Sequence, residues 1–105
     1  MKDISLMKEM TPKVAAILKQ MAHPKRLFLL CLIRDQEMSV SEIERLCGMG
    51  QSQTSQVLNQ LKNQGLITDR REGKNVFYQL KDQEIAQLLH ALYHIYCQDQ
   101  ETAHD

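Results

Sequence analysis

Hydrophobic residues near both ends of the chain recur at three- and four-residue spacing, as in helices that bury one face. Pro24 suits the first position of a helix that continues through the apolar run 27–33, and Asp82 suits the cap before the last helix. Pro12 fits the first helix only near its start or at a kink. The apolar stripe of the first helix comprises Met7, Met10, Val14, Ile17, Leu18 and Met21, and that of the last comprises Ile85, Leu88, Leu89, Leu92, Ile95 and Tyr96.

The middle of the chain, 39–64, predicts two short helices joined by a glycine-containing turn. Ser39 stands three residues before Glu42, the spacing of a capping box. Gly48 and Gly50 then end the first short helix, and the second follows over 51–64. We expect the first of these helices to bury Val40, Ile43 and Leu46, and the second to bury Thr54, Val57, Leu58 and Leu61.

Two β-rich runs, 66–71 and 74–80, flank Glu72 and Gly73, which predicts a β-hairpin. The chain is therefore expected to be mainly α (α+β), with about five helices and a two-stranded hairpin. Its 105 residues provide one modest core, so we predict a single domain over 1–105.

The outer face of helix 51–64 has the composition expected of a DNA-recognition helix. Seven of its fourteen residues are Gln or Asn, whose amides can donate and accept together at an adenine edge. An ordinary solvated helix face is the simpler alternative, but the hairpin that follows carries cations able to reach phosphates. The predicted DNA-binding residues are Gln51, Ser52, Gln53, Ser55, Gln56, Asn59 and Lys62 of the helix, and Arg70, Arg71 and Lys74 of the hairpin.

The formal net charge of zero conceals a polarised chain. Residues 59–81 carry five basic and two acidic groups, whereas 82–105 carry five acidic groups and no Lys or Arg. The segment that contains the hairpin is thus basic, and the C-terminal segment is acidic, even though the whole chain is neutral. Neither a secretory signal nor a membrane-length apolar run is evident, so we expect a soluble, cytoplasmic protein that does not bind membranes.

Residues 15–98 resemble the ArsR-type family of small bacterial winged-helix repressors. The segment 21–27 matches the second-helix signature of that family, and 52–61 matches its recognition helix. Gly50 stands where a capping Ser is commoner, and Val57 where a His is commoner. The resemblance implies a winged helix-turn-helix at 39–64, a wing at 66–80, dimerisation through helices 1–22 and 82–98, and a tail at 99–105. The implied partners are a second copy of the chain and a double-stranded, inverted-repeat operator with half-sites about 34 Å apart.

Cys31 and Cys97 resemble the paired thiols of one subgroup, the biofilm-growth and haemolysin-type regulators and the sulfide-responsive repressors. The resemblance implies that DNA is released when these thiols are linked, either by reactive sulfur species such as persulfide and polysulfide or by oxidation. We expect a sulfane-sulfur donor as inducer because each inserted sulfur relaxes the geometry of the bridge. Cys97 is expected to attack and the more buried Cys31 to resolve. The alternative is that both are small core residues, which is also the expectation for Cys47.

A metal-sensing repressor of the same fold is the second hypothesis. The Cys-bearing metal tract of some family members corresponds to 38–42, where Ser39 replaces the thiolate. At the last-helix zinc site, Asp82 and Glu84 occupy two matching positions, but Ile95 and Gln98 fill the others. His90 and His94 form a separate i, i+4 pair that could bind a metal. We predict no metal site and no cofactor.

Two further classes fit the sequence less well. A thiol hydrolase or reductase lacks a C-x-x-C motif, a nucleophile elbow and a Gly-rich phosphate loop, so we predict that the chain is not an enzyme. A winged helix used only for protein contacts would not need cations clustered at the tip of its hairpin.

Overall fold

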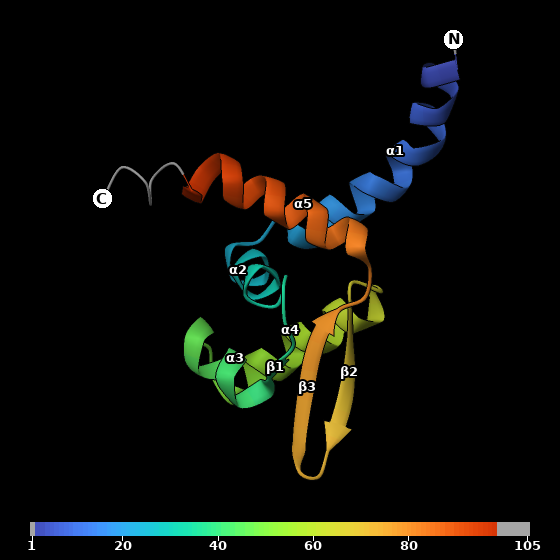
Figure 1. Cartoon of the computed structure of the whole chain (residues 1–105). Helices are drawn as coiled ribbons and strands as arrows, with labels where there is room; N and C mark the ends of the chain where they lie inside the picture. The colour runs from blue at the N-terminus through green and yellow to red at the C-terminus, as the bar shows by residue number, and fades with distance from the viewer. Residues whose placement is uncertain (1, 99–105) are drawn as a thin grey trace.

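A computed structural model describes residues 2–98 of the chain (Figure 1). The elements follow in the order α1 (Lys2–Met21), α2 (Pro24–Leu32), β1 (Met38–Ser39), α3 (Val40–Cys47), α4 (Gln51–Asn63), β2 (Ile67–Glu72), β3 (Asn75–Leu80) and α5 (Gln83–Tyr93). A π-helical turn, His94–Gln98, extends α5. The predicted five helices and hairpin are therefore present, and the tail assigned to 99–105 lies outside the described residues.

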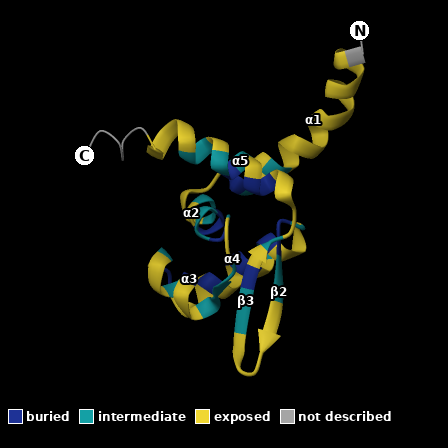
Figure 2. Cartoon of the chain, viewed as in Figure 1, coloured by how far each residue is buried: buried dark blue, intermediate teal, exposed yellow. Residues whose placement is uncertain are grey.

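The first half of α1 projects away from the rest of the fold (Figure 1). Pro12 lies inside this helix and not at its start, so one backbone hydrogen bond is missing there. Next to it, the hydroxyl of Thr11 donates to the carbonyl of Met7. The apolar side chains of this half are exposed, including Ile4, Leu6 and Met7, because no other part of the described chain covers them (Figure 2).

The sheet has three antiparallel strands in the order β1-β3-β2. β2 and β3 form the predicted hairpin, with Ile67 opposite Leu80 and Glu72 opposite Asn75. β1 was not predicted, because two residues are too few to show an alternating pattern. Its Met38 is a strand residue only because it pairs with Tyr78 of β3.

The core lies where α2, α3, α4 and α5 converge on the base of the sheet (Figure 2). Two sequence expectations need correction there. Leu46 is 39 % exposed, because α3 is short and its last turn passes the edge of the core. Asp82 does occupy the cap position of α5, but its side chain accepts no capping hydrogen bond. The largest fully buried side chains include Leu29, Leu30, Ile33, Ile43, Leu58, Leu61, Ile67 and Leu89.

Within residues 2–98, none of the helices combines the length and the apolar character needed to cross a bilayer.

Candidate nucleic-acid interface and dithiol groove

The turn between α3 and α4 is fixed by local backbone chemistry. At the start of α3, Ser39 Oγ accepts from the backbone N–H of Glu42, and Glu42 Oε1 accepts from the backbone N–H of Ser39, each at 3.2 Å. This confirms the predicted capping box. At the other end Gly48 has a φ of 66°, a left-handed conformation that costs Gly little and closes α3. Gly50 then caps α4 without a side-chain hydrogen bond.

α4 presents the polar face that its sequence predicted. Its buried residues are Thr54, Val57, Leu58 and Leu61, which seat the helix on the core. The seven candidate residues of the opposite side, Gln51, Ser52, Gln53, Ser55, Gln56, Asn59 and Lys62, are all exposed. The structure thus gathers the candidate set of α4 on one accessible surface, with the N-terminal turn uncovered.

Gln60 is the amide of α4 that does not belong to this surface. Its Oε1 accepts a hydrogen bond of 2.9 Å from Nη2 of Arg26, whose Nη1 also donates to Gln20 Oε1 at 3.2 Å. Arg26 therefore fastens α4 to α2 and to the end of α1. Sequence reasoning missed this role, although the three-residue spacing of Gln60 from Val57 places it beside the buried stripe.

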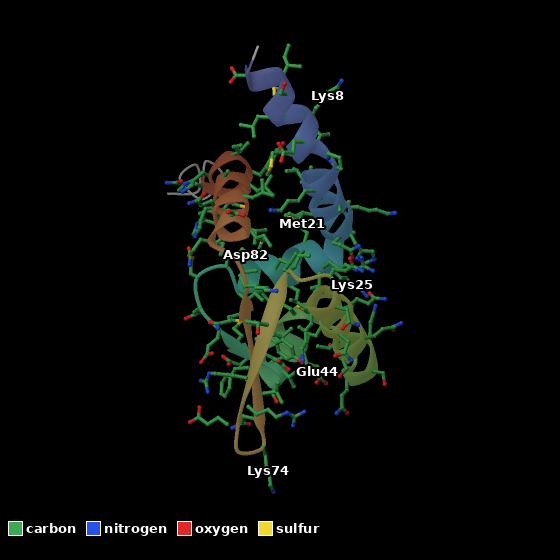
Figure 3. All side chains as sticks on the ribbon, turned by 90° about the vertical axis from the view of Figure 1, so that its right-hand side faces the viewer. Lys8, Met21, Lys25, Glu44, Lys74 and Asp82 are labelled. Carbon is green, nitrogen blue, oxygen red and sulfur yellow. The ribbon has the colours of Figure 1, made fainter. Side chains whose placement is uncertain are left out.

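The three cations of the wing differ in their surroundings. Arg70 is engaged within the chain: its guanidinium donates to both carboxylate oxygens of Glu37, donates to Glu72 at 2.8 Å, and lies 4.6 Å from the centre of the Phe77 ring. Arg71 and Lys74 are exposed, and no ion pair holds either of them among residues 2–98. Lys74 stands at the hairpin turn and points away from the body (Figure 3).

The contacts of Arg70 have the expected electrostatic consequence. The hydrogen bond from Arg70 lowers the pKa of Glu37 below its ordinary value. Because Glu37 directly precedes β1 and Arg70 belongs to β2, this pair links β2 to the start of β1 on the other side of β3. Lys62 of α4 forms a second pair with Asp69 of β2, at 3.0 Å, so the recognition helix is also tied to the wing.

Cys31 of α2 and Cys97 of the π-helical turn line the same groove, which has a volume of about 470 Å³. Cys31 is half-buried and Cys97 is exposed. The pKa of the Cys31 thiol lies above its ordinary value, mainly because the thiol is partly buried. The charge of Arg34 lowers this pKa, and that of Cys97 raises it further. The structure thus brings together two thiols that are 66 positions apart in the sequence.

Arg34 is the residue of this region that sequence reasoning missed. Its Nη1 donates to the carbonyl of Cys31 at 2.6 Å, and its guanidinium carbon lies 4.7 Å from the centre of the Tyr93 ring. It also lines the groove. Nothing in the local pattern marks it, because the chain after α2 must first turn before this side chain can reach α5.

The remaining candidates take other positions. Cys47 is half-buried and packs against the core, where burial raises its pKa. His90 Nε2 lies 2.5 Å from Asp35 Oδ1, and His94 Nδ1 is hydrogen-bonded to Gln98 Oε1. Over residues 2–98 there is no group of three or more His, Cys, Asp or Glu side chains that could hold a metal ion, and neither Asp82 nor Glu84 belongs to one.

Comparison with known proteins gives a consistent result for fold and sequence. Residues 23–69 match the family model described as "Bacterial regulatory protein, arsR family". The chain is 40 % identical over 97 residues to the biofilm growth-associated repressor of Xylella fastidiosa, which covers 92 % of this chain and 85 % of that protein.

Two solved structures extend the comparison. The transcriptional regulator HlyU of Vibrio vulnificus superimposes with a TM-score of 0.84 at 36 % identity, covering 90 % of this chain and 99 % of the other. The homodimeric winged helix-turn-helix DNA-binding domain of Mb0332 from Mycobacterium bovis gives a TM-score of 0.74 at 28 % identity, covering 93 % and 89 %. The winged-helix architecture predicted from the sequence is thereby confirmed.

Proposed function

Because this chain belongs to the arsR family of bacterial regulatory proteins, we propose that it is a dimeric transcriptional repressor that leaves an inverted-repeat operator when Cys31 and Cys97 become linked. Like its relatives, it is a transcriptional regulator and not an enzyme. The observation that carries the proposal is that the two thiols, one from α2 and one from the end of α5, line a single groove.

The exposed polar face of α4 supports direct reading of bases. In helix-turn-helix proteins the N-terminal turns of the second helix contact base edges in the major groove. Gln51, Ser52, Gln53, Ser55 and Gln56 occupy these turns and are exposed. Asn59 and Lys62 come later and are assigned to the DNA backbone. Arg71 and Lys74 extend the same function to the wing, where free cations neutralise phosphates.

Uncovered apolar surface supports dimerisation. α1 has an exposed apolar stripe, and Ile95 is exposed in the turn that extends α5. The stripe of α1 comprises Ile4, Leu6, Met7, Met10, Val14 and Leu18. Contiguous apolar surface of this kind marks an association site. The related Mb0332 domain is homodimeric. Two copies joined through α1 and α5 would present two α4 helices to half-sites about 34 Å apart.

Linking the thiols would act on the geometry of this dimer. The π-helical turn that carries Cys97 extends α5, which belongs to the proposed dimer seam. α2 carries Cys31 and is tied to α4 through the hydrogen bond from Arg26 to Gln60. A bridge between α2 and α5 would therefore change how α4 is held relative to the two-fold axis. A small change in the separation of the two recognition helices lowers operator affinity, because both must fit their half-sites together.

The test measures operator affinity and intact mass on the same samples after exposure to an organic polysulfide. Wild type, Cys31→Ser, Cys97→Ser and Cys47→Ser are compared. We expect wild type and Cys47→Ser to gain an intramolecular bridge and to release DNA, and the other two to retain DNA. If Cys31→Ser and Cys97→Ser release DNA as wild type does, the thiol-switch proposal is wrong.

A further inference from the structure

The dithiol groove has walls that suit an organic molecule better than an ion. Its lining consists of the two thiols, Arg34, and six hydrocarbon or aromatic side chains, Leu27, Phe28, Leu32, Leu92, Tyr93 and Tyr96. Its volume of about 470 Å³ falls in the range of pockets that hold small ligands. α2 and α5 also lie away from the tip of the wing (Figure 1), so the groove is at a distance from the hairpin cations Arg71 and Lys74.

Arg34 is the one charged residue on this lining. The hydrogen bond to the Cys31 carbonyl and the contact with the Tyr93 ring hold its guanidinium between the end of α2 and the end of α5. Its Nε is buried and makes no hydrogen bond within the described chain; the nearest acidic oxygen, on Asp35, is 3.6 Å away. The guanidinium thus has an N–H group without an acceptor and lies beside Cys31. Burial alone would disfavour a thiolate there, and a nearby positive charge favours it.

We propose that this groove is a binding site for neutral, apolar organic sulfane-sulfur donors of the trisulfide class, and that Arg34 is the counter-ion of the sulfur anions formed there. The proposal rests on the proposed function, since it names the molecule that links Cys31 to Cys97. Apolar walls favour an apolar donor because its hydrocarbon groups gain free energy on leaving water, whereas a charged donor must give up hydration.

The chemistry balances without a further oxidant. The Cys97 thiolate attacks the central sulfur of R–S–S–S–R, one S–S bond breaks, and a first R–S⁻ leaves. The Cys31 thiolate then attacks the sulfur newly attached to Cys97, and a second R–S⁻ leaves. The two cysteines are oxidised to a bridge of three sulfurs, the donor is reduced to two thiolates, and the two cysteine protons end on these thiolates as R–SH. Arg34 donates to the backbone carbonyl of Cys31 and lines the groove with it, so its charge lies beside the nucleophile of the second step.

The first test compares two donors with the same reacting atoms. Diallyl trisulfide is neutral and apolar, whereas glutathione trisulfide is charged and hydrated. The rate of bridge formation in the wild-type chain is followed by intact mass and divided by the rate of each donor with N-acetylcysteine. We expect the normalised rate to favour diallyl trisulfide by about tenfold or more. Equal normalised rates would overturn the proposal.

The second test changes the polarity of one side chain on the groove lining. Phe28 lines the groove but is 47 % exposed, so Phe28→Gln changes its polarity without removing a core side chain. Leu46 is 39 % exposed and belongs to α3, outside the groove, which makes Leu46→Gln the matched control. The preference for the apolar donor should fall in Phe28→Gln and persist in Leu46→Gln. A preference that is unchanged in Phe28→Gln, or lost in both, contradicts the proposal.

The third test concerns the charge of Arg34. Arg34→Met should accumulate the trisulfide adduct, in which Cys97 Sγ carries –S–S–R. The rate of bridge closure should reach its plateau at higher pH, since fewer Cys31 thiols are ionised. Arg34→Lys should restore the pH profile, because it restores the charge. A purely structural role would leave the pH profile of Arg34→Met unchanged, and that result would overturn the assignment.

Failure of this inference is distinguishable from failure of the proposed function. If the bridge forms with the expected donor preference but operator affinity stays unchanged, the thiol switch is wrong and the groove assignment holds. If both donors release DNA at equal normalised rates through Cys31 and Cys97, the switch holds and the groove assignment is wrong.

Discussion

The guanidinium of Arg70 donates hydrogen bonds to both carboxylate oxygens of Glu37 and so joins a residue of the wing to the segment that precedes β1. The contact pairs one of the three wing cations within the chain, whereas Arg71 and Lys74 have no ion pair among the described residues. The contact also ties β2 of the wing to the segment before β1, which leads directly into α3.

The pair should be visible in the titration of Glu37. Its pKa is lowered by the hydrogen bond from Arg70, so the pair contributes stability above the ordinary Glu pKa and loses it as the pH falls through the lowered value. Carboxyl-detected NMR should give a midpoint for Glu37 below that of an ordinary Glu. In Arg70→Gln the midpoint should rise toward the ordinary value, and in Arg71→Gln it should not move. An unshifted Glu37 in wild type would mean that the pair does not persist in solution.

The salt dependence of operator binding should separate the wing cations. In a plot of log K against log salt, each phosphate contact that is removed makes the slope shallower by about 0.9. One substitution removes a contact in each subunit of the dimer. Arg71→Gln and Lys74→Gln should each reduce the slope, whereas Arg70→Gln should reduce it less because its guanidinium is already paired. Lys81→Gln is the control, because Lys81 is exposed and follows β3 at the end remote from the hairpin turn. A slope that none of the wing variants changes would place the wing away from DNA.

Base reading by α4 should be local. Gln56→Ala should cost about 1–3 kcal/mol at its own base pair and leave non-specific binding nearly unchanged. Asn63 is also an exposed amide of α4 but lies at its C-terminal end, so Asn63→Ala should have little effect on specific binding. Affinities for the operator and for an unrelated duplex are measured at the same salt. Equal losses on both duplexes for Gln56→Ala would refute its assignment to a base.

The three thiols should react in a fixed order. Cys97 is exposed, whereas Cys31 and Cys47 are half-buried and burial raises the pKa of both. Under limiting iodoacetamide near neutral pH, Cys97 should be labelled first, and labelling of the other two should accelerate as the pH rises toward their raised pKa values. The unfolded chain should lose this order. Labelling of Cys31 before Cys97 would reverse their assigned roles.

The capping box of α3 should contribute measurably to stability. Ser39→Ala removes the acceptor for the Glu42 N–H and should lower the free energy of unfolding by about 1 kcal/mol in urea denaturation. Ser41→Ala replaces an exposed Ser inside the same helix and serves as the control. Equal effects of the two substitutions would show that the cap adds nothing beyond helix propensity.

Local patterns in the sequence determined most of the elements. The apolar periodicity of α4, the Ser39 and Glu42 spacing, and the glycine between two β-rich runs each depend on residues within one or two turns, and the structure matches them. The exposed recognition face followed directly, because a helix that buries Val57 and Leu58 must turn its amides outward. The resemblance of Cys31 and Cys97 to paired thiols also came from the sequence.

Tertiary structure decided what distant residues do to one another. β1 exists only through its pairing with β3, and Arg70 is ion-paired only because Glu37 lies across the sheet. Gln60 accepts a hydrogen bond from Arg26 instead of facing solvent with the other amides. Arg34 reaches Tyr93 only because α5 packs over α2. Each of these contacts joins residues many positions apart, and its energy depends on a packing arrangement that no local periodicity encodes. For that reason the sequence predicted the helices, the hairpin and the candidate thiols, whereas the groove between the thiols and its single cation emerged only from the folded chain.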